Sequence, residues 1–213
     1  MCTWPKGGAE LATGSGRVFQ VGVGYFNECM NGFEYQVGAH MIWEGEPDSD
    51  LVRKGLAIAR TIHDRYLPDR RNPYNEIECS DHYSRSMMAY GTFLALCGYD
   101  YHGPNQHLAF APRLQPEHFR AAFTAAEGWG SLSQERTDAV QTERITVHWG
   151  GLGLKSLGFE LPPGAKAKAV EVVCAGTPCP ATHRAEGRAL RVRLGDGIRL
   201  EQDESLDGRI RYA

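Results

Sequence analysis

The residues of this sequence best suited to chemistry lie between positions 71 and 85, in the stretch RNPYNEIECSDHYSR. Glu76 and Glu78 are two positions apart, so their carboxylates point to the same side of an extended segment. Arg85 opens an apolar stretch, where a cation needs a carboxylate partner. Carboxylates accept hydrogen bonds from hydroxyl groups, and a guanidinium donates them. The stretch therefore predicts a binding site for a neutral, hydroxyl-rich ligand such as a sugar, on a loop that leads into a helix.

The same residues also admit a structural interpretation. Glu76 and Glu78 are solvated carboxylates in that interpretation, since charged side chains are mostly exposed, or one of them forms a structural ion pair with Arg85. His82 lies in the first turn of the expected helix, where the dipole disfavours a charged imidazole. It is then either a neutral hydrogen-bonding group or a packing residue. The four tryptophans are interpreted as core or turn anchors rather than sugar platforms: Trp4, Trp43, Trp129 and Trp149.

Helical periodicity surrounds this loop on both sides. It predicts three helices, over 32–44, 49–66 and 80–98. The second helix has the clearest apolar stripe, and Asp48 or Ser49 can cap it. The third helix is apolar nearly all round, which predicts that it is buried.

After about position 105 the helical period gives way to alternation and β-branched runs, separated by Gly, Pro and Asp turns. FRAAFTAAEGWG fits a short helix as well as a strand, and strand is favoured. Helices first and strands last predict an α+β fold with segregated layers. The predicted strands are HLAFAPRL, FRAAFTA, RITVHWG, LGLKSLGFEL, KAVEVVCA, ALRVRL, GIRLEQ and GRIRYA.

Composition and cysteine usage narrow the class of protein. A net charge of −3 over 213 residues gives no electrostatic basis for binding nucleic acid or an anionic membrane surface. No apolar run is long enough for a membrane span, and the first six residues are unlike a signal peptide. None of the six cysteines forms a CxxC pair or has zinc-ligand spacing, so neither metal nor cofactor is predicted. Free thiols in a cytoplasmic protein are expected, and a Cys174–Cys179 disulfide is the alternative.

Residues 72–99, NPYNEIECSDHYSRSMMAYGTFLALCGY, resemble a long motif of glycoside hydrolase family 116. The family pattern runs approximately N-P-[WY]-N-E-[VI]-E-C-[GS]-x-H-Y-[SA]-R-[SA]-M, near the end of the catalytic domain. Residues 32–45, GFEYQVGAHMIWEG, are similar to the preceding helix of the family. The resemblance covers roughly residues 1–160 and fades in the last fifty.

The resemblance implies both a fold and an activity. Residues 1–105 would form the C-terminal helices of an (α/α)6 barrel, and residues 106–213 a β-rich C-terminal extension. Members of the family are retaining β-glucosidases and glucosylceramidase-like enzymes that use a nucleophilic carboxylate and an acid/base carboxylate. Both catalytic carboxylates are expected upstream of this chain, which would make it a C-terminal fragment that is inactive by itself and has no catalytic residue of its own.

Carried over position by position, the resemblance implies that Glu76 and Arg85 bind glucose hydroxyls in the −1 site. Glu78 and His82 are further candidates for contact with the sugar. Met30 stands where the family has a tryptophan that lines the glucose site, so substrate preference is expected to differ from that of the β-glucosidases. The rival hypotheses are a free-standing, non-catalytic carbohydrate-binding or structural module and an inactive remnant. For the hydrolase fragment and for the carbohydrate-binding module, the expected partner is a carbohydrate. The sequence predicts no particular oligomeric state.

Overall fold

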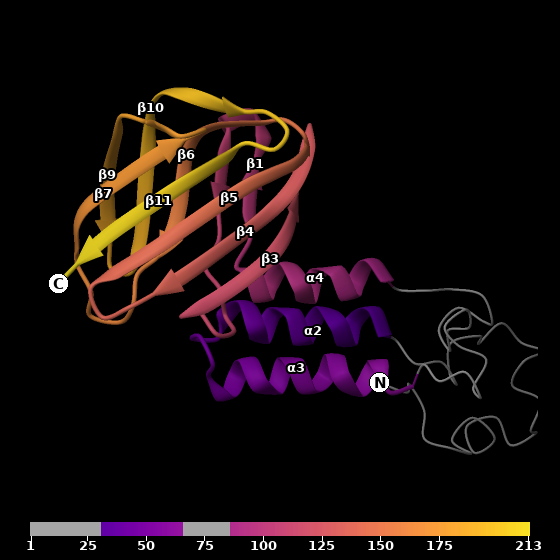
Figure 1. Ribbon diagram of the computed structural model, residues 1–213. Helices are drawn as coiled ribbons and strands as arrows, with labels where there is room; N and C mark the ends of the chain where they lie inside the picture. The colour runs from indigo at the N-terminus through magenta and orange to yellow at the C-terminus, as the bar shows by residue number, and fades with distance from the viewer. Residues whose placement is uncertain (1–30, 66–85) are drawn as a thin grey trace, which may run out of the picture. The chain divides into compact units, whose positions relative to one another are not determined.

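The computed structural model describes residues 31–65 and 86–213 (Figure 1). Within them, three helices come first and two β-sheets follow, which confirms the predicted α+β class. The chain divides into two compact units, residues 1–95 and 96–213, of which the second holds all the described strands. The (α/α)6 barrel and the boundary between 105 and 106 stay predictions.

Helices α2 (Asn31–Glu44) and α3 (Asp50–His63) lie side by side and confirm the first two predicted helices. Ser49 caps α3, because its hydroxyl accepts a hydrogen bond from the Val52 N–H at 3.4 Å. The two helices approach closely where each has a glycine: a Cβ atom on Gly38 would lie 3.0 Å from the Gly55 carbonyl oxygen. Arg65 then joins the end of α3 to the start of α2 through Glu34, at 2.7 Å.

Helix α4 (Ser86–Cys97) lies within the third predicted helix. The prediction that this helix is buried is wrong for its N-terminal half, where Met87 is 83% exposed and Tyr90 is 42% exposed. Its C-terminal half is better covered, since Ala95 and Cys97 are buried. An apolar surface all round a helix is buried only where neighbouring elements cover every side, and the described residues cover only part of this one.

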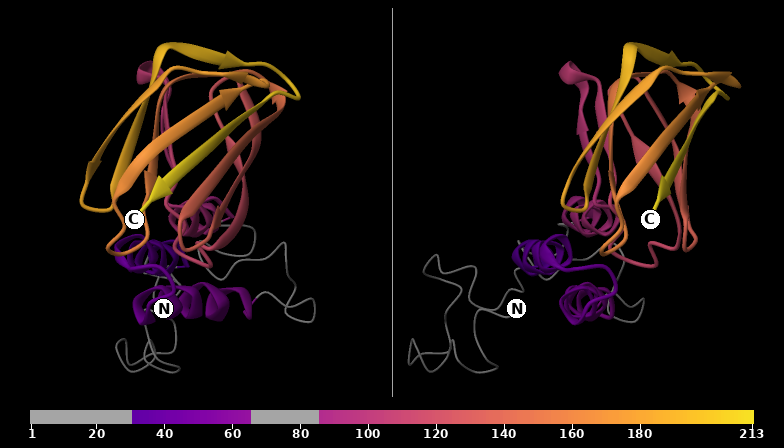
Figure 2. Two further views of the ribbon diagram at one scale, coloured as in Figure 1. Left: turned by 60° about the vertical axis from the view of Figure 1, so that its left-hand side comes forward. Right: turned by 90° about the vertical axis from the view of Figure 1, so that its left-hand side faces the viewer.

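The second unit, called the β unit below, consists of two stacked sheets (Figure 2). The five-stranded sheet has the order β1-β2-β6-β10-β9, and the six-stranded sheet has the order β3-β4-β5-β11-β7-β8. All described pairings are antiparallel except that of β2 with β6. The strands are β1 (Asp100–His102), β2 (His107–Ala109), β3 (His118–Thr124), β4 (Gly128–Arg136), β5 (Val140–Gly150), β6 (Leu152–Glu160), β7 (Ala167–Cys174), β8 (Thr177–Pro178), β9 (Ala181–Glu186), β10 (Ala189–Leu200) and β11 (Ser205–Tyr212), and a 3-10 turn, η3 (Gly103–Asn105), joins β1 to β2.

One hydrophobic core lies between the two sheets. It takes residues mainly from alternate positions of the longer strands, such as Leu157 on β6 and Val192 on β10 from one sheet, and Ile145 on β5 and Leu206 on β11 from the other. The residues between them face outward, as the period of two requires. The three described cysteines have free thiols: Cys97, Cys174 and Cys179.

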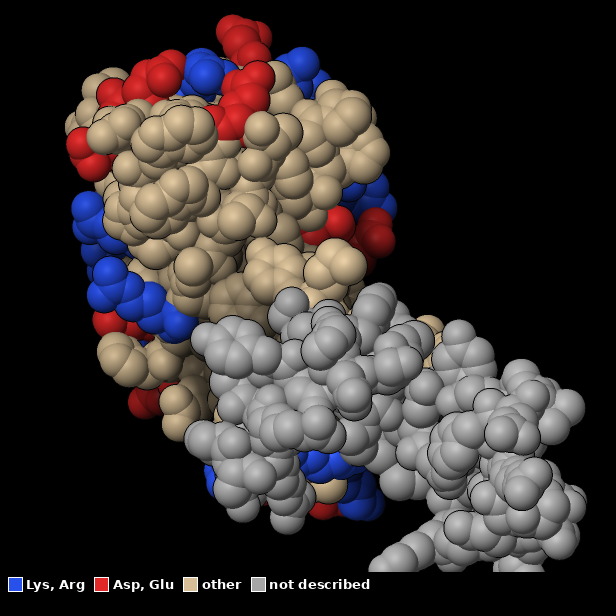
Figure 3. All heavy atoms as spheres, turned by 90° about the vertical axis from the view of Figure 1, so that its right-hand side faces the viewer, with Lys and Arg blue, Asp and Glu red and all other residues tan. Residues whose placement is uncertain are grey.

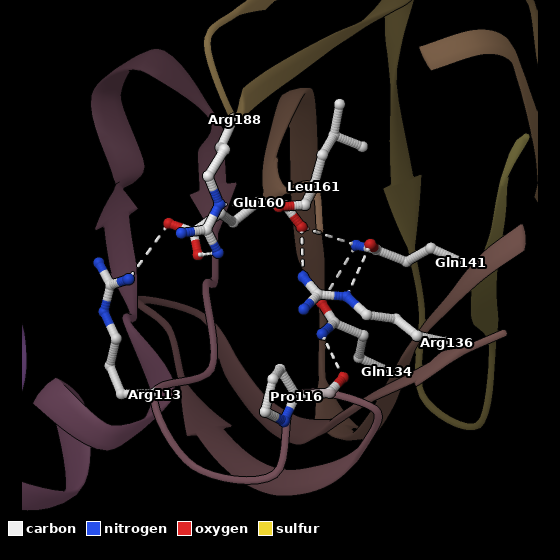
Figure 4. A network of polar contacts seen from close by, with 8 residues as sticks. All are labelled: Arg113, Pro116, Gln134, Arg136, Gln141, Glu160, Leu161 and Arg188. Atoms are coloured by element: carbon white, nitrogen blue, oxygen red, sulfur yellow. Dashed lines mark hydrogen bonds and ion pairs between the residues drawn. The ribbon is translucent and has the colours of Figure 1, made fainter. Parts of the chain in front are cut away.

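Glu160, at the end of β6, is the centre of a polar network at one end of the β unit (Figure 4). Its carboxylate accepts from Arg113 at 3.1 Å and from Arg188 at 2.7 Å. Its backbone carbonyl accepts from Arg136 and from Gln141, which belong to the other sheet. One residue of the five-stranded sheet therefore binds two side chains of the six-stranded sheet, through a charge-assisted hydrogen bond from Arg136 and a neutral one from Gln141.

Glu143 is the most deeply buried carboxyl group in this region. Its Oε1 atom accepts a 2.6 Å hydrogen bond from Gln141, whereas its Oε2 atom has no hydrogen-bond partner among the described residues. Burial raises the pKa of Glu143 well above its usual range, which outweighs the lowering by Gln141 and Arg136. The folded protein therefore favours the neutral carboxyl at this position.

This burial predicts a pH-dependent effect of Glu143→Gln. Because the carboxyl holds its proton in the folded state and releases it near pH 4.5 in the unfolded state, wild-type stability falls as pH rises above 4.5 towards the folded-state pKa. Glutamine does not titrate, so we expect the variant to match the wild type near pH 4 and to melt a few degrees higher near pH 8, since ~1 kcal/mol shifts Tm by roughly 4 °C in a domain of this size. Calorimetric Tm values across this pH range test the expectation.

The exposed Glu135 on neighbouring β4 provides the control, because Glu135→Gln removes a carboxylate without changing a buried one. A Glu143→Gln effect that is the same at both ends of the pH range would contradict a buried, protonated Glu143.

Candidate functional site

The sugar-site residues predicted from the sequence all lie outside the described residues, so their roles stay predictions. They are Met30, Glu76, Glu78, His82 and Arg85. Of the predicted loop and helix, the structure describes only α4, which begins at Ser86, directly after Arg85.

The β unit has a cavity of its own on the outer face of the five-stranded sheet, with a volume of about 800 Å³. Its floor consists of the outward residues of four strands, β2, β6, β10 and β9. Small residues make the centre of the floor close-packed: a Cβ atom on Gly158 would lie 2.6 Å from the Cβ atom of Ala109. At the centre of the cavity floor, the backbones of β2 and β6 lie close together and carry small side chains. Long side chains line the edges of the cavity.

Those long side chains are mostly cationic. The cavity lining includes Lys155, Arg191 and Arg193, and it includes Arg184 paired with Glu186 at 2.7 Å. Glu186 is the one carboxylate in the lining, so the cavity carries a net positive charge although the whole chain carries −3. This arrangement favours ligands that offer carboxylate, phosphate or hydroxyl acceptors.

His107 and Ser156 form a polar pair across β2 and β6. The Nδ1 atom of His107 lies 2.8 Å from the Ser156 hydroxyl, and the two residues are register partners in the parallel pairing. Burial, followed by the nearby charge of Arg191, lowers the pKa of His107, so the ring is neutral near pH 7. The pair can therefore donate and accept hydrogen bonds without adding a charge.

Glycoside hydrolysis through an enzyme nucleophile requires two carboxyl groups on either side of the scissile bond. The cavity lining has one carboxylate, Glu186, and Arg184 already binds it. The geometry fits ligand binding rather than that two-carboxylate chemistry. Sequence reasoning missed the cavity, although the outward arginines that alternate with apolar residues in ALRVRL were a usable signal.

The tryptophans correct another sequence interpretation. Trp43, Trp129 and Trp149 were predicted to be core or turn anchors, and exposures of 42%, 49% and 59% exclude a position in the core. Trp4 lies outside the described residues. Their apolar character alone did not distinguish these rings from core residues. Trp129 occupies an outward position of β4, and an irregularity in the pairing of β4 with β5 places Trp149 on the surface as well.

Among residues 31–65 and 86–213, no cluster of three or more His, Cys, Asp or Glu side chains could hold a metal ion. None of the described helices has both the length and the apolar character needed to cross a membrane.

Comparisons with known proteins find likeness only among solved structures. No protein-family model and no curated protein matches the chain. An α-L-rhamnosidase from Dictyoglumus thermophilum is similar to 63% of this chain with 11% identity and a TM-score of 0.35. A glycoside hydrolase is similar to 59% of this chain with 12% identity and a TM-score of 0.34. The chain spans 14% and 19% of the lengths of these two proteins, and likeness of this extent assigns it to no family.

The cavity geometry predicts how His107 titrates. We expect NMR titration of the imidazole to give a pKa below the ordinary 6.5, and Arg191→Ala to raise it part of the way back, since burial remains when the cation is removed. Arg209→Ala on β11, in the other sheet, is the matched control and should leave the His107 titration unchanged. A His107 pKa above 6.5, or one indifferent to Arg191, would contradict this account of the cavity.

Proposed function

We propose that this chain is the C-terminal part of a glycoside hydrolase, supplying sugar-binding residues of the −1 site but neither catalytic carboxylate. The observation that carries the proposal is the stretch at 72–99, in which Glu76 and Arg85 match the sugar-binding positions of family 116. The finer assignment to β-glucosidase or glucosylceramidase-like chemistry rests on that resemblance alone.

The chemistry of the loop supports this role. A carboxylate at Glu76 and a guanidinium at Arg85 together offer acceptors and donors to vicinal hydroxyl groups. Proline fixes one backbone angle, so Pro73 would restrict the predicted loop. Because α4 begins at the residue after Arg85, the guanidinium would be attached next to the start of a helix. Glu78 and His82 would extend the same polar surface, and Met30 would replace an aromatic wall with a flexible thioether.

A free-standing carbohydrate-binding module is the second candidate, and one observation favours it. Among the described residues, the core of the β unit comes entirely from residues 96–213: its buried members and the partly buried residues packed against it all come from position 99 onward. A unit with its own core can fold without a preceding catalytic domain.

The proposal predicts that the 213-residue chain alone does not hydrolyse glycosides, because a retaining mechanism needs both carboxylates. We expect no turnover above buffer with aryl β-glucosides, β-xylosides or β-galactosides. Turnover that disappears in Glu76→Gln or Glu78→Gln would show that the catalytic groups are in this chain and would overturn the proposal.

In a longer enzyme that contains this chain, Glu76→Gln and Arg85→Lys should each lower kcat/KM on an aryl β-glucoside by roughly 10- to 100-fold. Each change weakens a charge-assisted hydrogen bond worth about 1.5–3 kcal/mol, and lysine lacks the guanidinium fork. Glu44→Gln and Arg53→Lys, on the exposed surfaces of α2 and α3, are the matched controls. An enzyme indifferent to both loop changes would remove Glu76 and Arg85 from the sugar site.

A further inference from the structure

Two tryptophans lie next to each other on the outer face of the six-stranded sheet. Trp129 on β4 is the register partner of Trp149 on β5, and the side chains are 49% and 59% exposed. No other large hydrophobic side chain in residues 96–213 is exposed to this degree, since the remaining ones lie on the helices. An exposed apolar pair on an otherwise well-buried unit indicates a surface that contacts something.

A β-bulge and two glycines, Gly128 and Gly150, determine the backbone conformation beside this pair. Trp129 is opposite Trp149, whereas Gly130 is opposite Val147, so β5 has one additional residue, His148. Such a bulge redirects the side chains beside it. A Cβ atom on Gly128 would collide with the Trp149 carbonyl oxygen, and Gly150 has a φ of +75°. The backbone beside both rings therefore requires glycine.

Polar groups lie beside the rings on the same face. The Nε2 atom of His148 is 2.9 Å from the Ser131 hydroxyl, and its ring centroid is 5.6 Å from that of Trp129. Further along β5, the outward Arg144 pairs with Asp207 of the neighbouring β11 at 3.4 Å, so the charge of Arg144 is compensated. Figure 3 looks onto the edge of the β unit that lies on the right of Figure 1, where much of the surface is uncharged and charged side chains lie around it.

We propose that Trp129 and Trp149 form a binding platform for an uncharged oligosaccharide. The indole faces cover the C–H face of a pyranose ring, and the polar edges of His148 and Ser131 reach its hydroxyl groups. The platform lies on the opposite sheet from the cationic cavity, whose lining favours acidic ligands. It uses no residue of the 71–85 loop, so it does not depend on the proposed function.

The size of the platform favours a sugar over a protein partner. Two indoles that are half exposed offer roughly 250 Å² of surface, taking about 240 Å² for a whole side chain. A stable protein interface needs about 800 Å² from each partner. The area suits one or two sugar rings, which need only a shallow platform with a few polar contacts.

The test is binding of neutral tetrasaccharides to the 213-residue chain, with cellotetraose, xylotetraose and mannotetraose as probes at millimolar concentration. Titration calorimetry and the change in tryptophan fluorescence report binding. We expect at least one probe to bind, and both Trp129→Ala and Trp149→Ala to weaken it by roughly tenfold or more, as loss of a stacked ring does. Trp149→Phe keeps a ring and should retain most of the affinity, which separates stacking from folding.

Trp43→Ala is the matched control, since Trp43 is an exposed tryptophan on α2. Glu76→Gln is the second control, because unchanged affinity separates the platform from the proposed −1 site. The proposal would be overturned if none of the three probes bound, or if Trp129→Ala and Trp149→Ala both bound as tightly as the wild type. Sedimentation that shows a dimer of the wild type and a monomer of these variants would identify the face as a protein interface instead.

Discussion

Alternation along the strands is the constraint on which the β unit depends. The longer strands, such as β4, β5, β10 and β11, give about every second residue to the one core between the sheets and the residues between them to an outer face. A slip of one residue would exchange the two sets, so the buried leucines also fix where the polar residues point. Leu157 and Val192 thus determine that Ser156 and Arg191 face the cavity, and Leu132 determines that Ser131 faces outward beside the tryptophans.

The polar groups within the sandwich are accommodated in two different ways. At the end where β6 finishes, the Glu160 carboxylate is paired with Arg113 and Arg188. Glu143 has only an amide partner, and burial favours its neutral form instead. Both satisfy the requirement that a charge removed from water be either paired or neutralised. The sheets are joined by the uncharged backbone carbonyl of Glu160, which accepts from Arg136 and Gln141.

Sequence reasoning succeeded where apolar periodicity was strong and failed where it was weak. The stripe and cap of α3 and the alternation of β6 and β11 were visible as patterns. Strand β4 was not recognised as a separate strand, because its inward positions include Gly128, Gly130 and Gln134 rather than aliphatic residues. Strand β9 is polar and mostly exposed, so it has no apolar signal at all. The pairing of His107 with Ser156 is a tertiary effect across 49 positions, which no local pattern contains.

The parallel pairing of β2 with β6 has a consequence for how the β unit assembles. Between these neighbours the chain first runs through β3, β4 and β5, which belong to the opposite sheet. Closing that long loop costs chain entropy before the contacts of β2 and β6 can offset it, and such non-local pairings form slowly. The hairpins of the six-stranded sheet are local and can form early. The floor of the cavity, which includes β2, β6 and β10, is therefore among the last surfaces to appear during folding, and a nascent chain could form it only after β10 has been synthesised.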